Sequence, residues 1–129
     1  MRLAPERIRL KRVYDPSEAA DGFRLLVDRL WPSGLNKSAA AVDRWMKDVA
    51  PSAELRRWYH QDLTRWDEFR RRYESELADS PATEHLRAII RDQGRAGATL
   101  LYGARDVKRN HAVVLREVLL AGGGRRRTR

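Results

Sequence analysis

The sequence predicts an α/β protein in which a small parallel or mixed sheet of three to four strands carries helices in a Rossmann-like three-layer arrangement. Two short apolar runs, 23–27 and 98–102, are nearly continuous, which is typical of strands buried on both faces. Between and after them lie segments whose apolar residues recur at helical spacing. Strands that alternate with helices along a chain indicate a sheet with helices packed on it.

A further strand is expected at residues 8–13, where the sequence IRLKRV alternates apolar and basic residues and so gives one face to the core. Turn-forming residues separate it from FRLLV at 23–27, which ends abruptly at Asp28. Residues 41–49 are ambiguous, because their apolar positions also suit a helix. We expect a short strand or extended segment there.

Helices account for most of the remaining chain. Ser52 is expected to cap a short helix that runs to about Tyr59. Thr64, followed three residues later by Asp67, is a capping-box variant and predicts the start of the clearest helix. Two more helices are expected at 81–92 and 107–121, and the second carries one stripe formed by Val107, His111, Val114, Leu115 and Val118.

The length of 129 residues fits one domain at residues 1–121, followed by a flexible basic tail, GGGRRRTR, at 122–129. The chain has no cysteine, which excludes a disulfide framework, a thiolate zinc site and a cysteine nucleophile. It has no signal-peptide h-region and no uncharged apolar run near eighteen residues, so we expect a cytoplasmic protein without a membrane partner.

The charge of the chain is strongly basic, with 27 Lys and Arg against 18 Asp and Glu. Four of these cations lie in the tail, and without them the formal charge falls from +9 to +5. Such a balance suits an anionic small ligand, a nucleic acid, or simply a solvated charged surface.

Polar side chains gather where the two buried strands end. The first loop delivers Asp28, Arg29 and Trp31, and the second delivers Tyr102, Arg105 and Asp106, with Asn110 and His111 in the next helix. Ligands of open α/β sheets bind outside the carboxyl ends of the strands. We therefore expect one functional surface there, with Asp28 and His111 as hypothetical catalytic groups and the other six residues as ligand-binding groups.

Each of these residues also has a structural interpretation. Asp106 is expected to cap a helix by accepting from the backbone N–H of Lys108 or Arg109. His111 sits on an apolar stripe and should point inward, either as a neutral proton acceptor or as a core histidine bonded to a backbone carbonyl. Asp28 is equally an ion-pair partner of Arg105 or a carboxylate that fixes its loop.

Other candidate groups are weaker. His60 and His85 lie at a helix end and on a polar helix face without convergent partners, and three scattered histidines do not form a metal site. Trp45, Trp58 and Trp66 are better explained as core or groove lining than as a base-stacking platform. No glycine-rich nucleotide motif, GxSxG or HExxH occurs, so no cofactor or metal is expected.

The motifs VDRLWPSG, KDVAPS, ELRRWY and LLYGARD…NHA resemble the YeaO-like branch of the domain-of-unknown-function 488 (DUF488) family over residues 7–120. The resemblance implies a small cytosolic bacterial α/β domain. It also implies signature positions at Asp28, Arg29, Trp31, Pro32, Gly34, Lys47, Asp48, Pro51, Ser52, Trp58, Asp106, Asn110 and His111. Other branches carry Cys-His-Arg where this chain has Asn110-His111-Ala112, which puts thiol chemistry in doubt.

Three functions fit these observations. The first is an enzyme or binder of a small anionic compound, with Arg29 and Arg105 holding the anion and His111 or Asp28 moving a proton. The second is a nucleic-acid-associated module using Lys11, Arg12, residues 70–72 and the arginine tail, although no nucleic-acid-binding motif is present. The third is a protein-interaction module with a tryptophan-rich helix as its surface.

Overall fold

The computed structural model describes residues 3–121, so the predicted tail at 122–129 lies outside the described residues. Four parallel strands form a sheet in the order β1-β4-β2-β3. They are β1 (Ile8–Arg12), β2 (Phe23–Leu26), β3 (Arg44–Trp45) and β4 (Ala98–Tyr102). β4 pairs with β1 on one side and β2 on the other, and all five of its residues are buried. The predicted α/β class is therefore confirmed.

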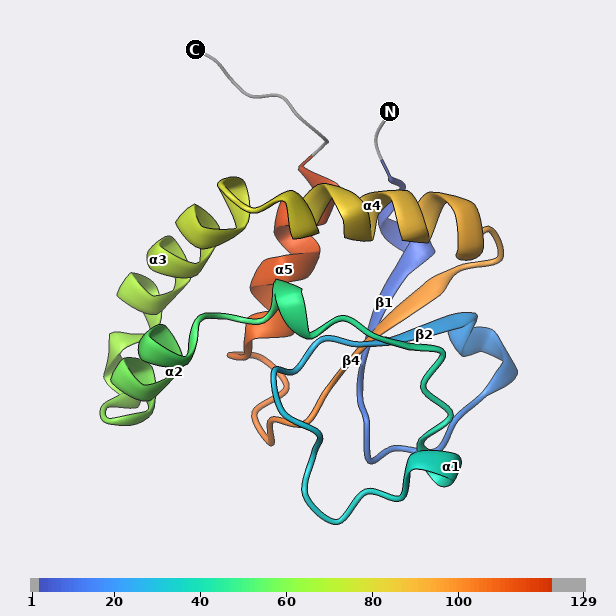
Figure 1. Ribbon diagram of the computed structural model, residues 1–129, viewed down its shortest axis with the longest axis horizontal. Coiled ribbons are helices and arrows are strands. Elements are labelled where there is room, and N and C mark those ends of the chain that lie inside the picture. The colour runs from blue at the N-terminus through green and yellow to red at the C-terminus, as the bar shows by residue number, and fades with distance from the viewer. Residues whose placement is uncertain (1–2, 122–129) are drawn as a thin grey trace.

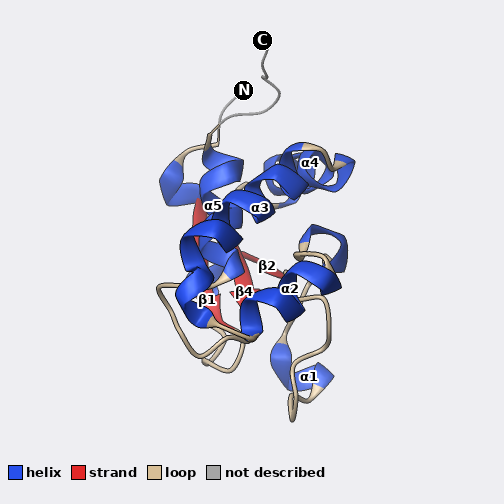
Figure 2. Ribbon diagram, turned by 90° about the vertical axis from the view of Figure 1, so that its left-hand side faces the viewer, coloured by secondary structure: helices blue, strands red, loops and turns tan. Residues whose placement is uncertain are grey.

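Within residues 3–121, five α-helices accompany the sheet. They are α1 (Lys37–Ala40), α2 (Ala53–His60), α3 (Trp66–Ala78), α4 (Pro81–Gln93) and α5 (His111–Leu120). Figure 1 shows α4 across the top of the view, α2 and α3 at the left, and α1 at the lower right. In Figure 2 the short helix α1 again lies away from α3 and α4. No helix in residues 3–121 has the length and apolar character that crossing a membrane requires.

The two faces of the sheet are covered differently. One face, which includes Leu25 and Leu100, joins the large core with α2, α3, α4 and α5. The other face, built on Leu26 and Leu101, packs against partly buried side chains from the segment 31–45. Neighbouring residues of one strand serve opposite faces because side chains alternate along it. The third layer of the fold is therefore thin and made mainly of loop.

The ambiguous region 41–49 resolves into a two-residue strand and a short 3-10 turn at Lys47–Val49. Trp45 belongs to the thin layer, whereas Trp58 and Trp66 pack against the large core, in agreement with their interpretation as lining. Ser52 caps α2 as predicted, because its side chain accepts from the N–H of Leu55.

Two predicted helix starts are wrong. The Thr64 capping box does not form: Asp62 accepts from the N–H of Thr64, and α3 then begins at Trp66 without a side-chain cap. The last helix begins at His111 rather than near 107, with Asn110 as its cap. Val107 is consequently outside the helix and 56% exposed, not on its inner stripe. Polar residues that form local turns compete with helix starts over a few residues, which makes these boundaries hard to predict.

The thin layer is attached to the sheet by a buried charged pair. Arg24 of β2 is ion-paired with Asp21, and its guanidinium also donates to the carbonyl oxygens of Ala40 and Ala41. Lys11 pairs with the same carboxylate. Burial raises the pKa of Asp21, but hydrogen bonds from Lys11, the Glu18 N–H and Arg24 outweigh it and leave that pKa lowered. The pair therefore stays charged and joins the segment before β3 to the sheet.

The sheet also depends on one glycine. Gly22, directly before β2, has φ +66°, and a Cβ there would lie 2.2 Å from the carbonyl oxygen of Gly97. Phe23 accordingly donates its N–H to that carbonyl as β2 meets β4. Only glycine allows the two strand starts to approach this closely.

Candidate functional site

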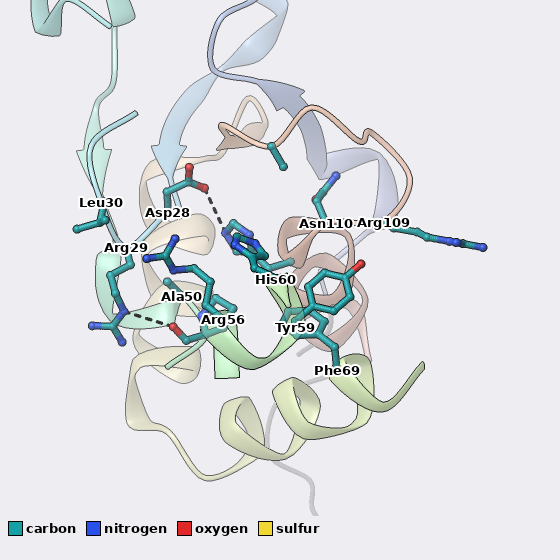
Figure 3. A pocket seen from close by; sticks show the side chains of 13 residues that line it. Asp28, Arg29, Leu30, Ala50, Arg56, Tyr59, His60, Phe69, Arg109 and Asn110 are labelled. Atoms are coloured by element: carbon teal, nitrogen blue, oxygen red, sulfur yellow. Dashed lines mark hydrogen bonds and ion pairs between the residues drawn. The ribbon is translucent and has the colours of Figure 1, made fainter. Parts of the chain in front are cut away.

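A pocket of about 200 Å³ opens at the carboxyl ends of β2 and β4. Its lining comes from four segments: the loop after β2, the residues before α2, α2 itself, and the connection from β4 to α5. Phe69 of α3 completes the lining. Figure 3 shows these side chains gathered around one space. Parallel strands end at the same edge of a sheet, which is why loops far apart in sequence meet here.

Asp28 lies between the two strand ends. Its Oδ2 accepts the N–H of Gly103 at 3.0 Å, so the carboxylate ties the loop after β2 to the loop after β4. A Cβ at position 103 would lie 2.9 Å from this oxygen, which explains the glycine. Asp28 forms no ion pair with Arg105 among the described residues. The interpretation as a loop-fixing carboxylate matches this geometry.

His111 is the first residue of α5 and points inward, with a side chain 15% exposed. Its Nε2 lies 3.0 Å from the carbonyl oxygen of Val27 and 3.3 Å from Oδ1 of Asp28. A carbonyl oxygen can only accept, so Nε2 carries the proton and donates it to Val27. The Oδ1 atom of Asp28 is buried and receives no hydrogen bond from the described residues.

Cationic side chains dominate the polar part of the pocket. Arg29, Arg56 and Arg109 line it, and Asp28 is the one carboxylate among the lining residues. Arg29 donates from Nε to the carbonyl oxygen of Pro51 at 3.4 Å, while the buried Nε of Arg56 has no partner within residues 3–121. Figure 3 shows Arg56 extending toward Asp28 and Arg109 pointing away from the pocket. Arg56 is half-buried, whereas Arg29 and Arg109 are exposed, so Arg56 is the inner cation of the pocket and Arg29 contributes from its rim.

His60 closes α2 and reaches the same pocket. Although His60 is exposed at the surface, partial desolvation of its imidazole lowers its pKa below the ordinary value, and the nearby charge of Arg56 lowers it further. The imidazole is therefore neutral at neutral pH. A bound anion would oppose the effect of Arg56 and favour the protonated form.

The apolar floor of the pocket is aromatic. Tyr59 and Phe69 stack with ring centroids 4.6 Å apart, and both are almost completely buried. Burial raises the pKa of the Tyr59 phenol, with a further contribution from Asp106. The hydroxyl of Tyr59 is thus protonated at neutral pH and is not a base.

The structure brings together four of the eight predicted site residues: Asp28, Arg29, Asn110 and His111 all line the pocket. The other four do not line it. Arg105 is exposed on the loop after β4, and Tyr102 is buried in the large core. Trp31 packs on the opposite face of the sheet, against Trp45.

Asp106 is exposed and accepts from the N–H groups of Lys108 and Arg109, as predicted. These bonds form a turn that precedes α5, however, and the cap of the helix is Asn110. Asn110 is buried, accepts from Val113 and donates to the carbonyl oxygen of Asp106. The start of α5 at His111 is thus fixed by two consecutive local motifs, the turn at Asp106 and the cap at Asn110.

Sequence reasoning missed the contribution of α2 and α3, namely Arg56, Tyr59, His60 and Phe69. One signal was present: Arg56 and His60 are four residues apart, so they share one face of a helix. That spacing alone does not tell which face meets the sheet edge. Within residues 3–121, no group of three or more acidic, histidine or cysteine side chains is arranged to hold a metal ion.

Comparisons with known proteins place these residues in a family. Residues 7–127 match the family described as "Inactive DUF488-N3 subclade". The uncharacterized protein Rv3073c of Mycobacterium tuberculosis (strain H37Rv) is 48% identical over 113 residues, which cover 88% of this chain and 93% of that protein. The uncharacterized protein YeaO of Escherichia coli K12 is 44% identical, covering 87% and 96%. No solved structure matches the chain. The chain therefore belongs to the DUF488 family, in its YeaO-like branch.

Proposed function

We propose that this protein binds a small anionic ligand in the strand-end pocket and does not convert it chemically. The observation that carries the proposal is the absence of carboxylate partners for two cations of the pocket, Arg29 and Arg56. Neither Arg29 nor Arg56 is ion-paired with a carboxylate within the described residues, although both line a pocket that can hold a ligand. Guanidinium groups form short, bidentate hydrogen bonds with carboxylate or phosphate oxygens.

Arg56 replaces Arg105 in this hypothesis. Arg105 was expected to grip the anion with Arg29, but it is not a lining residue. Arg56 enters from α2, and Figure 3 draws it on the same side of the pocket as Arg29. An anion that pairs with the guanidinium of Arg56, whose buried Nε has no partner within residues 3–121, would lower the free energy of this half-buried charge.

Several observations favour binding over catalysis. Nε2 of His111 donates to Val27 and Oδ2 of Asp28 accepts from Gly103, so a backbone hydrogen bond holds each group in place. Of these two side chains' polar atoms, Oδ1 of Asp28 has no hydrogen bond within residues 3–121. The position that carries cysteine in other branches is Asn110, a buried helix cap. The family description also names the subclade inactive.

The nucleic-acid alternative receives less support from the described cations. Arg70 pairs with Glu74 and Glu117, while Arg71 and Arg72 pair with Glu68. Lys11 pairs with Asp21 and Glu18, and Arg12 donates to the carbonyl oxygens of Ala104 and Gly103. The carboxylates offset part of this positive charge, which weakens the field that these cations present to a phosphate backbone.

The test is a thermal-shift screen of the full chain against phosphorylated and carboxylated metabolites, followed by calorimetric titration of each hit. A ligand at 100 times its dissociation constant stabilises the folded state by about 2.7 kcal/mol. Arg56→Gln should lower the affinity for the hit about tenfold or more, because it removes a charge-assisted hydrogen bond. Arg57→Gln is the matched control: Arg57 is the next residue of α2, is exposed and does not line the pocket.

Equal affinities in the two variants and the wild type would reject the pocket as the anion site. A product signal in NMR spectra of the hit incubated with the protein would reject binding without conversion. Oligonucleotide binding that falls steeply with salt, in the absence of any small-anion hit, would favour the nucleic-acid module instead.

A further inference from the structure

Leu30 is placed unusually for a large apolar residue. Its side chain is 61% exposed, yet it directly follows Arg29 and lines the strand-end pocket. Tyr14, Leu63 and Val107 are the other large apolar side chains exposed in residues 3–121, and none of them lines this pocket. The exposed apolar surface of Leu30 thus adjoins Arg29 and lines the same pocket as Arg56.

The pocket also has apolar lining residues that are buried. The stacked pair of Tyr59 and Phe69 forms the floor, and Pro51 adds a further apolar lining residue. These groups are fixed in place, because Tyr59 and Phe69 also belong to the large core. The pocket therefore combines a rigid apolar floor, an exposed apolar rim residue and a cationic side.

We infer that the ligand is an amphipathic anion: an aryl- or alkyl-substituted phosphate or carboxylate whose apolar group covers Leu30 and contacts Tyr59 and Phe69. This inference rests on the proposed function, since Arg29 and Arg56 must hold the anionic end. A simple inorganic anion would leave the 61% exposed side chain of Leu30 in contact with water. Removing about 100 Å² of apolar surface from water strengthens binding well over tenfold.

Matched probes separate the two ends of such a ligand. Phenyl phosphate and methyl phosphate share the dianionic ester group and differ in the apolar part, and phenylacetate and acetate form the same comparison for a carboxylate. Calorimetric titration of the full chain should give an affinity about tenfold or more higher for the phenyl probe of at least one pair. The pair that binds identifies the anionic group.

Two variants then test which residues act on which end. Leu30→Ser should weaken the phenyl probe about fivefold and leave the methyl probe unchanged, because only the ring contacts this side chain. Leu63→Ser is the matched control, since Leu63 is 60% exposed and does not line the pocket. Arg56→Gln should weaken both probes of the pair by the same factor. Thermal denaturation of each variant verifies that it folds.

The outcomes distinguish the inference from the function on which it rests. If phenyl and methyl probes bind equally, and Arg56→Gln weakens both, the amphipathic ligand is rejected and the anion site stands. If no probe binds, or Arg56→Gln changes nothing, both are rejected. An equal loss in Leu30→Ser and Leu63→Ser also overturns the inference.

Discussion

Some arginine side chains have a structural role in this chain. Arg7 donates to the carbonyl oxygens of Ile90 and Gly94 at the end of α4, and Arg87 donates to those of Val118 and Leu119 at the end of α5. Arg116 donates hydrogen bonds to the carbonyl oxygens of Pro5 and Ile8. These residues satisfy backbone acceptors at the ends of elements. A high arginine count is therefore partly structural.

At the residue scale, the pKa of His60 depends on the charge of Arg56. Its pKa is lowered by partial desolvation and by Arg56, so Arg56→Gln should raise that pKa toward the ordinary value of 6.5. Titration of the imidazole signals by NMR measures the shift. A lowered pKa means that the unfolded chain takes up this proton at higher pH than the folded chain. The contribution of His60 to stability is therefore present above about pH 6.5 and declines as the pH falls below it.

Arg57→Gln is again the control, because Arg57 is not among the causes of the shift at His60. An unchanged pKa of His60 in Arg56→Gln would show that the two side chains do not interact across the pocket. Binding of an anion to the wild-type protein should also raise the pKa of His60, because the anion counteracts the charge of Arg56.

At the scale of elements, the start of α5 determines how the second strand-end loop is placed. Asn110 supplies both the cap and the bond to the carbonyl oxygen of Asp106, and the turn at Asp106 precedes it. Because His111 is the first residue of α5, the cap at Asn110 also fixes the backbone position from which the His111 side chain extends. The pocket geometry thus depends on a buried amide rather than on the exposed carboxylate.

Alanine substitutions separate these two motifs. Asn110→Ala should lower the free energy of unfolding by about 2 kcal/mol, because it removes the cap and leaves buried backbone groups unsatisfied. Asp106→Ala should cost less than about 1 kcal/mol, because water can replace an exposed acceptor. Urea denaturation followed by circular dichroism measures both. A larger cost for Asp106→Ala would reassign the cap of α5 to Asp106.

At the scale of the whole molecule, the two faces of the sheet are covered by hydrophobic cores of very different size. Four helices cover one face, while the other relies on the segment 31–45, in which Trp31 and Trp45 meet edge to face with centroids 5.4 Å apart. Trp45 also donates from Nε1 to the carbonyl oxygen of Asp28 at 2.7 Å. The thin layer is therefore connected directly to the backbone of the pocket.

Trp45→Ala should lower the free energy of unfolding by about 3 kcal/mol, since it removes a large partly buried side chain from the small second core. Trp45→Phe keeps a ring but loses the hydrogen bond to Asp28, and should cost about 1 kcal/mol. Urea denaturation gives both values. If Trp45→Ala lies within 0.5 kcal/mol of the wild type by this measure, the thin layer does not contribute to stability.

The sequence by itself determined the strands and the polar residues that follow them. Runs such as 23–27 and 98–102 are apolar because their own strands are buried on both faces, and this local property can be predicted without knowing the partners. The positions of Asp28, Arg29 and His111 at one edge followed from the parallel sheet. Local patterning also predicted the cap at Ser52.

Only the tertiary structure decided which other side chains reach that edge. Arg56, His60 and Phe69 enter because α2 and α3 pack across the strand ends, a contact between segments far apart in sequence. The outward position of Arg105 follows likewise from where the loop after β4 turns toward α5. Spacing along a helix states which residues share a face, whereas the choice of the face that meets the sheet depends on the packing of the whole core.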